Sequence, residues 1–217
     1  MKTLTVESAL AAVRKNLDEQ GFNESVMYSD ENEDNKSLDL IVAKLLPEAI
    51  NDVNSSASVE TLEGSDISDS LTEKSVTGGV VTFSVPEAKK FLRLVKFKAS
   101  DTDFIVTEII AESSPEGRKQ LNPAIRGTWD RPRLVQMQGN VTSPTFKYYS
   151  LKDAKTDSVP KIEFYSVQRE EYDKATIKYD VSSALFERIL CHLTALVLAI
   201  YGEGDKSDYF EKLSQQK

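Results

Sequence analysis

The sequence predicts an α+β protein: a helical bundle around a long hydrophobic C-terminal helix, with an inserted antiparallel β lobe and an extended C-terminal tail. Three observations lead to this prediction. Near both ends of the chain, apolar residues recur every three or four positions, which is the helical period. From residue 79 onward, short stretches alternate apolar and polar residues, as half-buried strands do. The second half of the stretch 181–201 is almost continuously apolar.

The first helix is expected over residues 6–20. Its apolar face consists of Val6, Leu10, Val13 and Leu17. Leu10, Val13 and Leu17 lie four, seven and eleven residues after Val6, so the four side chains share one side of a helix. Thr5 is expected to cap the N-terminus and Gly21 to end the helix.

A second helix is expected over residues 38–53, with Ser37 as its cap. Its inward-facing residues are Leu38, Ile41, Val42, Leu45, Ala49 and Val53. Pro47 interrupts this pattern. Because its ring blocks one backbone hydrogen bond, Pro47 should kink the helix or split it.

Two polar segments, residues 23–36 and 54–78, flank the second helix. In the first, Asp30, Asn32 and Asp34 resemble the start of a calcium-binding loop. The glycine and the bidentate glutamate that such a loop requires are missing, so we predict an acidic connection without a metal. The second segment is rich in Ser, Asp, Glu and Gly and is expected to be a long polar loop.

The β lobe is expected over residues 79–179. The expected strands are 80–85, 92–98, 132–138, 145–151 and 161–168. Pro86 should open a short helical turn between the first two. Residues 103–112 fit a strand or a helix, and residues 113–130 are expected to be a loop because of their Pro and Gly content.

The C-terminal helix is expected over residues 181–201, about 30 Å at 1.5 Å per residue. From residue 193 only Thr194 is clearly polar, so this half should be buried on every face. Gly202 is expected to end it. The apolar run is too short for a membrane span. The expected domains are the bundle (1–53 and 180–203), the polar loop (54–78), the inserted β lobe (79–179) and the tail (204–217).

The composition excludes some functional classes. The chain has 217 residues and a net charge of −8, so it is a poor candidate for coating DNA, whose phosphates attract basic proteins. One cysteine, Cys191, excludes an intrachain disulfide and indicates a reducing compartment. The first residues lack the apolar region of a secretory signal.

No catalytic motif is apparent, so we predict no enzyme, no catalytic residue, no cofactor and no metal. The chain lacks a Gly-rich phosphate loop, a nucleophile elbow and a zinc-protease motif. His192, the single histidine, is expected to be a satisfied core residue, and Cys191 a small hydrophobe. A metal-dependent nuclease is a minor alternative that rests on four carboxylates: Asp101, Asp103, Glu108 and Glu112.

Two groups of residues are candidates for docking. The first is Arg126, Trp129, Arg131 and Arg133. Trp and Arg are favoured anchors of interfaces, but the simpler interpretation is that the tryptophan covers the β lobe while the arginines stay solvated. Residues 206–216 are expected to be a short polar helix or a tail, and they contain the second group: Tyr209, Phe210 and Leu213. Its aromatic residues either pack back on the bundle or insert into a partner, and both interpretations stay open.

The element order resembles that of the head-to-tail adaptor, or ring, proteins of short-tailed bacteriophages, particularly those of crAss-like gut phages. Six stretches carry the resemblance: VESALAAVRKNL, SLDLIVAKLLPEAI, VTFSVPEAKKFLRLVKFK, FKYYSL, KIEFYSV and ALFERILCHLTALVLAIYGEGDKSDYF. They are distributed over most of the chain. The segments 23–36 and 54–78 have no counterpart in that family's pattern.

The resemblance implies a structural virion protein of the neck or tail, made in the host cytoplasm. Its partners would be the portal protein, other ring or tail proteins, and copies of itself in a ring of twelve. The ring would extend the DNA channel below the portal, so DNA would only pass through, and no membrane is involved. The tail around Tyr209, Phe210 and Leu213 would dock on the portal. The alternative is a cytosolic, non-enzymatic binding or scaffold module whose β lobe holds a ligand or peptide.

Overall fold

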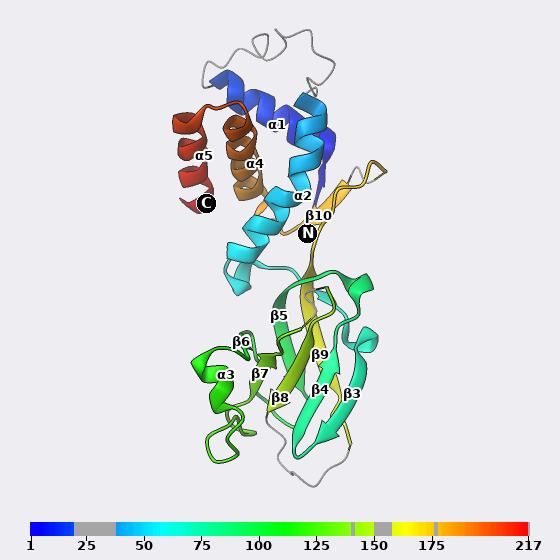
Figure 1. The fold of residues 1–217 in the computed structure, drawn as a ribbon. Coiled ribbons are helices and arrows are strands. Elements are labelled where there is room, and N and C mark those ends of the chain that lie inside the picture. Colours follow the sequence, from blue (N-terminus) through cyan, green and yellow to red (C-terminus); the bar gives the residue numbers. More distant parts are fainter. Residues whose placement is uncertain (20–37, 140–141, 150–157, 176–177, 217) are drawn as a thin grey trace. The chain divides into compact units, whose positions relative to one another are not determined.

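The computed structural model describes residues 1–19, 38–139, 142–149, 158–175 and 178–216 (Figure 1). Helices and strands are both present, which confirms the α+β class. The chain divides into two compact units. Met1–Glu63 and Arg169–Lys217 form the helical unit, and Gly64–Gln168 form the β unit. The acidic connection 23–36, the capping residues Ser37 and Gly21, and the calcium-loop pattern lie outside the described residues.

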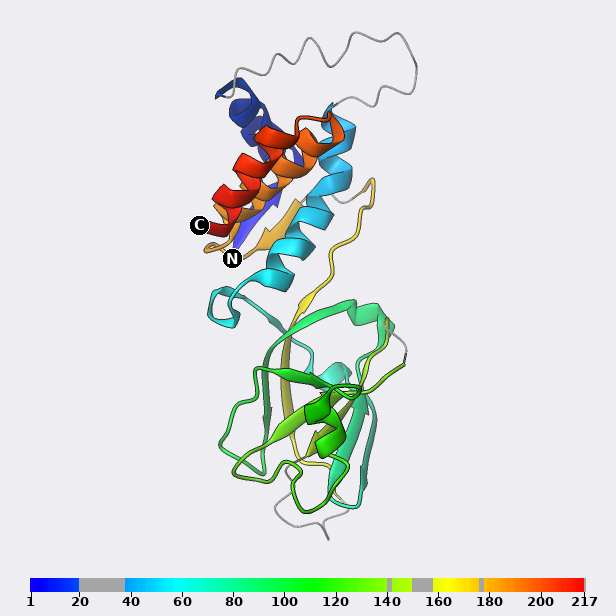
Figure 2. The ribbon, with the colours of Figure 1, turned by 60° about the vertical axis from the view of Figure 1, so that its left-hand side comes forward.

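The helical unit contains α1 (Val6–Glu19), α2 (Leu38–Ser56), α4 (Phe186–Ile200) and α5 (Gly204–Gln216). Helix α4 packs against α1, α2 and α5, so it is the central element (Figure 2). A 3-10 helix, Val59–Thr61, follows α2. The unit also contains a two-stranded antiparallel sheet of β1 (Lys2–Thr5) and β10 (Lys178–Val181).

Helix α1 begins with the predicted cap. The Thr5 hydroxyl accepts a hydrogen bond from the Ser8 amide, and the Ser8 hydroxyl accepts one from the Thr5 amide, both at 3.0 Å. This reciprocal pair satisfies two amides that the first turn leaves without helical partners. Val13 and Leu17 are buried as predicted, together with Ala9.

Helix α2 runs through Pro47 without a break, which corrects the expected split. Pro47 is itself buried, so its ring contributes to packing while the helix lacks one backbone hydrogen bond. The buried face includes Leu46 and Ile50, whereas Ile41 and Leu45, expected inside, are only half-buried.

The C-terminal helix is shorter than predicted. Helix α4 has 15 residues, about 22 Å at 1.5 Å per residue, instead of the expected residues 181–201. Val181 belongs to β10, where it pairs with Lys2 across the sheet. The expectation of burial on every face is also wrong, because Ile200 is 56% exposed. The sequence pattern could not reveal the strand, since its partner lies at the other end of the chain.

The extended tail expected over 204–217 is instead helix α5, which packs against α4. Gly202, with a φ of +78°, supplies the turn between the two helices. The amide of Glu203 donates to the Leu198 carbonyl at 3.1 Å, which is the six-residue bond of a Schellman C-terminus. Gly202 therefore ends α4 as predicted, but the chain turns back on the bundle.

The β unit contains two sheets. The three-stranded sheet has the order β2 (Ser65–Asp66), β9 (Ile162–Gln168), β5 (Phe91–Ala99). The five-stranded sheet has the order β3 (Thr72–Thr77), β4 (Val80–Ser84), β8 (Thr145–Tyr149), β7 (Arg133–Gln136), β6 (Ile109–Ala111). The lobe is not purely antiparallel, because β6 pairs with β7 in parallel. Residues 103–112, left open between strand and helix, thus include a strand.

Aromatic rings fill the space between these two sheets. Phe83 and Phe146 come from the five-stranded sheet, Phe97 and Phe164 from the three-stranded sheet, and all four are fully buried. Phe83 lies 5.6–5.8 Å from the other three rings, measured between centroids. These distances are typical of favourable aromatic pairs, so Phe83 is the centre of the core.

The segment 54–78 is not the expected polar loop. It contains the end of α2, the strands β2 and β3, and a second 3-10 helix, Ser68–Ser70. Gly78 and Gly79, both with positive φ, form the two-residue turn from β3 to β4, a conformation that favours glycine. The β unit therefore begins at residue 64 instead of 79, and residues 169–179, expected in the lobe, belong to the helical unit.

Candidate functional site

A groove lined by arginines lies where α3 (Pro115–Lys119) and the loop after it meet the start of β7. Residues 113–130, expected to be a loop, thus include a short helix. The Ser114 hydroxyl caps it by accepting a hydrogen bond from the Gly117 amide at 3.0 Å. A Cβ atom on Gly117 would lie 2.2 Å from the Ala111 carbonyl oxygen, so only glycine lets α3 approach β6 this closely.

Gln120 fixes the loop after α3. Its side chain is buried, its Oε1 accepts a hydrogen bond from the Gly127 amide at 2.7 Å, and its Nε2 donates to the Glu116 carbonyl at 3.2 Å. A buried amide with both ends satisfied holds its partners firmly, because breaking either bond would leave a desolvated polar group. The return of the chain to Gly127 brings Arg126 to the groove.

The residues that follow form a tight turn. The amides and carbonyls of Thr128 and Arg131 exchange two hydrogen bonds, 2.9 and 3.2 Å long. The Thr128 hydroxyl donates to the Asp130 carboxylate, and this bond holds the pKa of Asp130 below its ordinary value. Trp129 lies in the turn, with its carbonyl accepting a hydrogen bond from the Thr102 hydroxyl at 2.8 Å and with 49% of its surface exposed.

The groove has a volume of about 530 Å³ and a mixed lining. Its cations are Lys119, Arg126, Arg131 and Arg133, and its carboxylates are Glu108, Glu116 and Asp130. The Arg126 guanidinium donates to the Gly78 carbonyl at 3.0 Å. Within the described residues, Lys119 and Arg133 make no ion pair with a carboxylate. Their charges therefore remain available to a ligand.

The structure splits the predicted docking patch. It brings Arg126, Arg131 and Arg133 together on one groove, whereas Trp129 lies in the same turn but does not line it. Nor does Trp129 simply cover the β lobe, since half of it is exposed. Sequence reasoning missed Lys119 and Gln120. A single amide in a polar loop carries no pattern that would have indicated its burial.

The predicted docking residues of the tail have unequal surroundings. Phe210 is 4% exposed and its ring lies 5.3 Å from that of Tyr209, which is 48% exposed. Leu213 is half-buried. The Ser207 hydroxyl donates to the Ala195 carbonyl at 2.9 Å, which adds a polar contact between α5 and α4. Of the three predicted residues, only Tyr209 is largely accessible while α5 stays docked.

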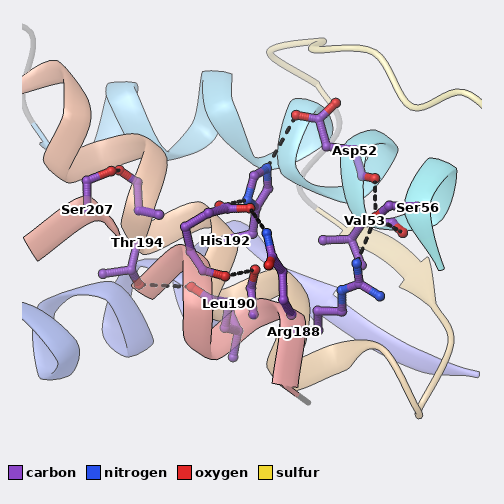
Figure 3. A network of polar contacts seen from close by, with 12 residues as sticks. Asp52, Val53, Ser56, Arg188, Leu190, His192, Thr194 and Ser207 are labelled. Carbon is purple, nitrogen blue, oxygen red and sulfur yellow. Dashed lines mark hydrogen bonds and ion pairs between the residues drawn. The ribbon is translucent and has the colours of Figure 1, made fainter. Parts of the chain in front are cut away.

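His192 lies on α4 and contacts carboxylates on α2 and α5, so its side chain joins three helices (Figure 3). Nδ1 lies 2.6 Å from Oε2 of Glu211 on α5, and Nε2 lies 3.3 Å from Oδ2 of Asp52 on α2. The His192 side chain is 14% exposed, whereas Asp52 and Glu211 are 55% and 40% exposed, so the ring is shielded more than its partners are. Nearby, Arg188 donates to the Ser56 hydroxyl at 2.7 Å. His192 thus positions α5, and its partner Glu211 was not apparent in the sequence because the packing of α5 on α4 was not expected.

The carboxylates of the nuclease alternative do not converge on one site. Asp101 accepts a hydrogen bond from the Tyr148 hydroxyl at 3.2 Å, and Glu112 accepts one from the Gln138 amide at 3.0 Å. Glu108 lies in the arginine groove and Asp103 is exposed. Within the described part of the chain, no group of three His, Cys, Asp or Glu residues is placed to hold a metal ion.

No protein-family model and no curated protein sequence matches this chain. In the parts that the structure describes, no helix is both long enough and apolar enough to cross a bilayer.

Proposed function

We propose that this chain is a structural virion protein, a head-to-tail adaptor that forms a ring under the phage portal and extends the DNA channel toward the tail. The sequence resemblance motivates the proposal. The proposed adaptor is a helical bundle around α4 with an inserted β unit, and helix α5 takes the place of the extended tail.

The single observation that carries the proposal is the distribution of exposed apolar side chains. In the helical unit they include Ile200 and Tyr209, on the two C-terminal helices. In the β unit they are Phe104, Ile105, Leu121, Ile125 and Trp129. A ring of identical subunits needs a head-to-tail interface, so each subunit must present two different surfaces. Two separate sets of exposed apolar side chains, one on each unit, fit that requirement.

Helix α5 is the element proposed to dock on the portal. With α5 held against α4, Tyr209 is the residue that a portal subunit reaches, as an aromatic anchor of the kind favoured at interfaces. Phe210 would become available only if α5 left the bundle. The net charge of −8 fits a channel wall, because a negative surface lets DNA pass without holding it.

The test is to co-express the full chain with the portal protein of the same phage and to image the product. A ring of this chain on the portal is expected, and portals without it would contradict the proposal. Tyr209→Ala should weaken portal binding about tenfold or more, since a hot-spot aromatic contributes roughly 2 kcal/mol. Lys212→Ala, at an exposed position of the same helix, is the matched control and should bind as wild type does.

A cytosolic, non-enzymatic binding module is the second candidate, favoured by the arginine groove beside an exposed tryptophan. It predicts that Trp129→Ala abolishes binding of a peptide or ligand while any assembly with the portal is unchanged. A pull-down of peptides with the wild-type chain and the variant distinguishes the two candidates.

A further inference from the structure

The two units differ sharply in charge. The helical unit contains 22 Asp and Glu against 12 Lys and Arg, a net charge of −10. The β unit contains 13 against 15, a net charge of +2. The acidity of the chain therefore belongs to its helical unit alone. Two copies of the chain attract each other when the β unit of one faces the helical unit of the other, and they repel when two helical units meet.

The arginine groove is the place on the β unit best suited to this attraction. Four cations line it, and Lys119 and Arg133 have no carboxylate partner within the described residues. Ile125, which is 58% exposed, supplies an apolar contact in the same groove. Guanidinium groups bind carboxylates with two parallel hydrogen bonds, so the groove can fix the register of an acidic surface as well as attract it.

The mixed lining argues against a nucleic acid as the occupant. Glu108, Glu116 and Asp130 stand among the cations and would repel a row of phosphates. A protein surface can instead place carboxylates opposite the arginines and basic or neutral groups opposite the three acids. Arginine is enriched at protein interfaces, which fits the same partner class.

We propose that the arginine groove binds the acidic helical unit of a second copy of this chain. The inference rests on the proposed function, because it names the head-to-tail contact that a ring requires. One surface of the pair is the groove with Ile125, and the other lies on the neighbour's helical unit, whose net charge is −10. Since the two surfaces differ, the contact repeats from copy to copy until the ring closes.

Charge reversal in the groove tests the contact. Arg131→Glu and Arg133→Glu should each weaken association between copies at least about tenfold, because each change replaces an attraction with a repulsion. Arg118→Glu is the matched control, since Arg118 is exposed on α3 directly before Lys119 but does not line the groove. Rings on portals are counted by imaging, and association without portal is measured by sedimentation at low and high salt. Salt should weaken the wild-type contact.

A photo-crosslinking residue at position 125 of the full chain identifies the occupant. The expected product is a crosslinked dimer whose second peptide comes from 1–63 or 169–217. Crosslinks to the portal, to DNA, to the β unit of the neighbour or only within one chain would each overturn the inference. Rings that form equally well with the Glu variants would overturn it while leaving the proposed function intact. If the wild-type chain forms no ring, the proposed function fails. A wild-type dimer that is lost in Arg131→Glu would then still support the groove contact. A wild-type chain that stays monomeric at all concentrations would contradict both the proposed function and the groove contact.

Discussion

The two units of this chain are stabilised in different ways. The core of the β unit is aromatic, with five fully buried Phe and Tyr side chains between its two sheets. The described core of the helical unit is aliphatic, and its only buried aromatic residues are Tyr179 and Phe210. Aromatic rings that contact each other from both sheets hold the two layers of the β unit together, whereas the described helices pack through aliphatic faces.

The difference between the two cores indicates which element can leave its packed position most readily. In the helical unit, α5 is attached through one buried aromatic ring, the His192–Glu211 contact and the Ser207–Ala195 hydrogen bond. Although α5 packs closely on α4, Phe210 is its only buried apolar side chain, and a helix that buries few apolar side chains belongs to the part of a protein that opens most readily. The β unit offers a rigid groove, and the helical unit offers a helix that a partner could bind or displace.

The largest effect is expected from Phe83→Ala. Phe83 contacts three other buried rings, so its removal should cost about 3–5 kcal/mol of unfolding free energy. Hydrogen exchange on the full chain should show lost protection in the β unit and retained protection in α1, α2 and α4. Phe104→Ala, at a site 50% exposed, is the control and should change little. Equal loss of protection in both units would show that they unfold together, and it would contradict the difference between their cores.

A smaller effect, about 2–4 kcal/mol, is expected from Phe210→Ala, because this ring is the main apolar contact of α5. The loss should be confined to α5 and to the face of α4 beneath it. Exchange of the amides of α5 measures it, with Lys212→Ala, at an exposed position of the same helix, as the control. If the variant loosens α1 and α2 as much as α5, then α5 is an integral part of the core and not a separable helix.

The sequence predicted the elements that local signals determine. The Thr5 cap, the stop at Gly202 and the alternating strand with Val81 and Phe83 are all set by neighbouring residues. The errors concern pairings between distant segments. The strand Lys178–Val181 exists because it pairs with Lys2–Thr5, and this removed the first turn of the expected C-terminal helix.

The candidate sites were predicted to a similar extent. Three arginines within eight residues were visible as a cluster, and the structure places them on one groove. The role of Gln120 in fixing that loop could not be predicted, because nothing in a sequence marks which amide in a polar loop becomes buried. For α5 the polar composition left a short helix and a solvated tail open, and the packing on α4 decides for the helix.

A double-mutant cycle between His192 and Glu211 measures how strongly this contact holds α5 on the helical unit. The two side chains approach to 2.6 Å at a partly buried site, so a coupling free energy of about 1 kcal/mol is expected from urea unfolding of both single variants and the double variant to alanine. The pair Glu203 and Lys206, at 3.4 Å and more exposed, is the control and should couple by roughly 0.3 kcal/mol. Equal coupling in the two cycles would mean that His192 does not specifically hold α5.

The smallest effect concerns acid stability of the β unit. The side chain and amide of Ser68 both donate to Asp66, and these bonds lower the pKa of its carboxyl below the ordinary 3.8. A lowered pKa in the folded state adds stability above pH 3.8, and this stability is lost as the pH falls through the lower value. Asp66→Asn should therefore be less stable than wild type at pH 6, and the difference should shrink as the pH falls below 3.8. Thermal unfolding between pH 2.5 and 6 measures it. A constant difference across that range would show that the pair with Ser68 contributes through shape alone and not through the charge of Asp66.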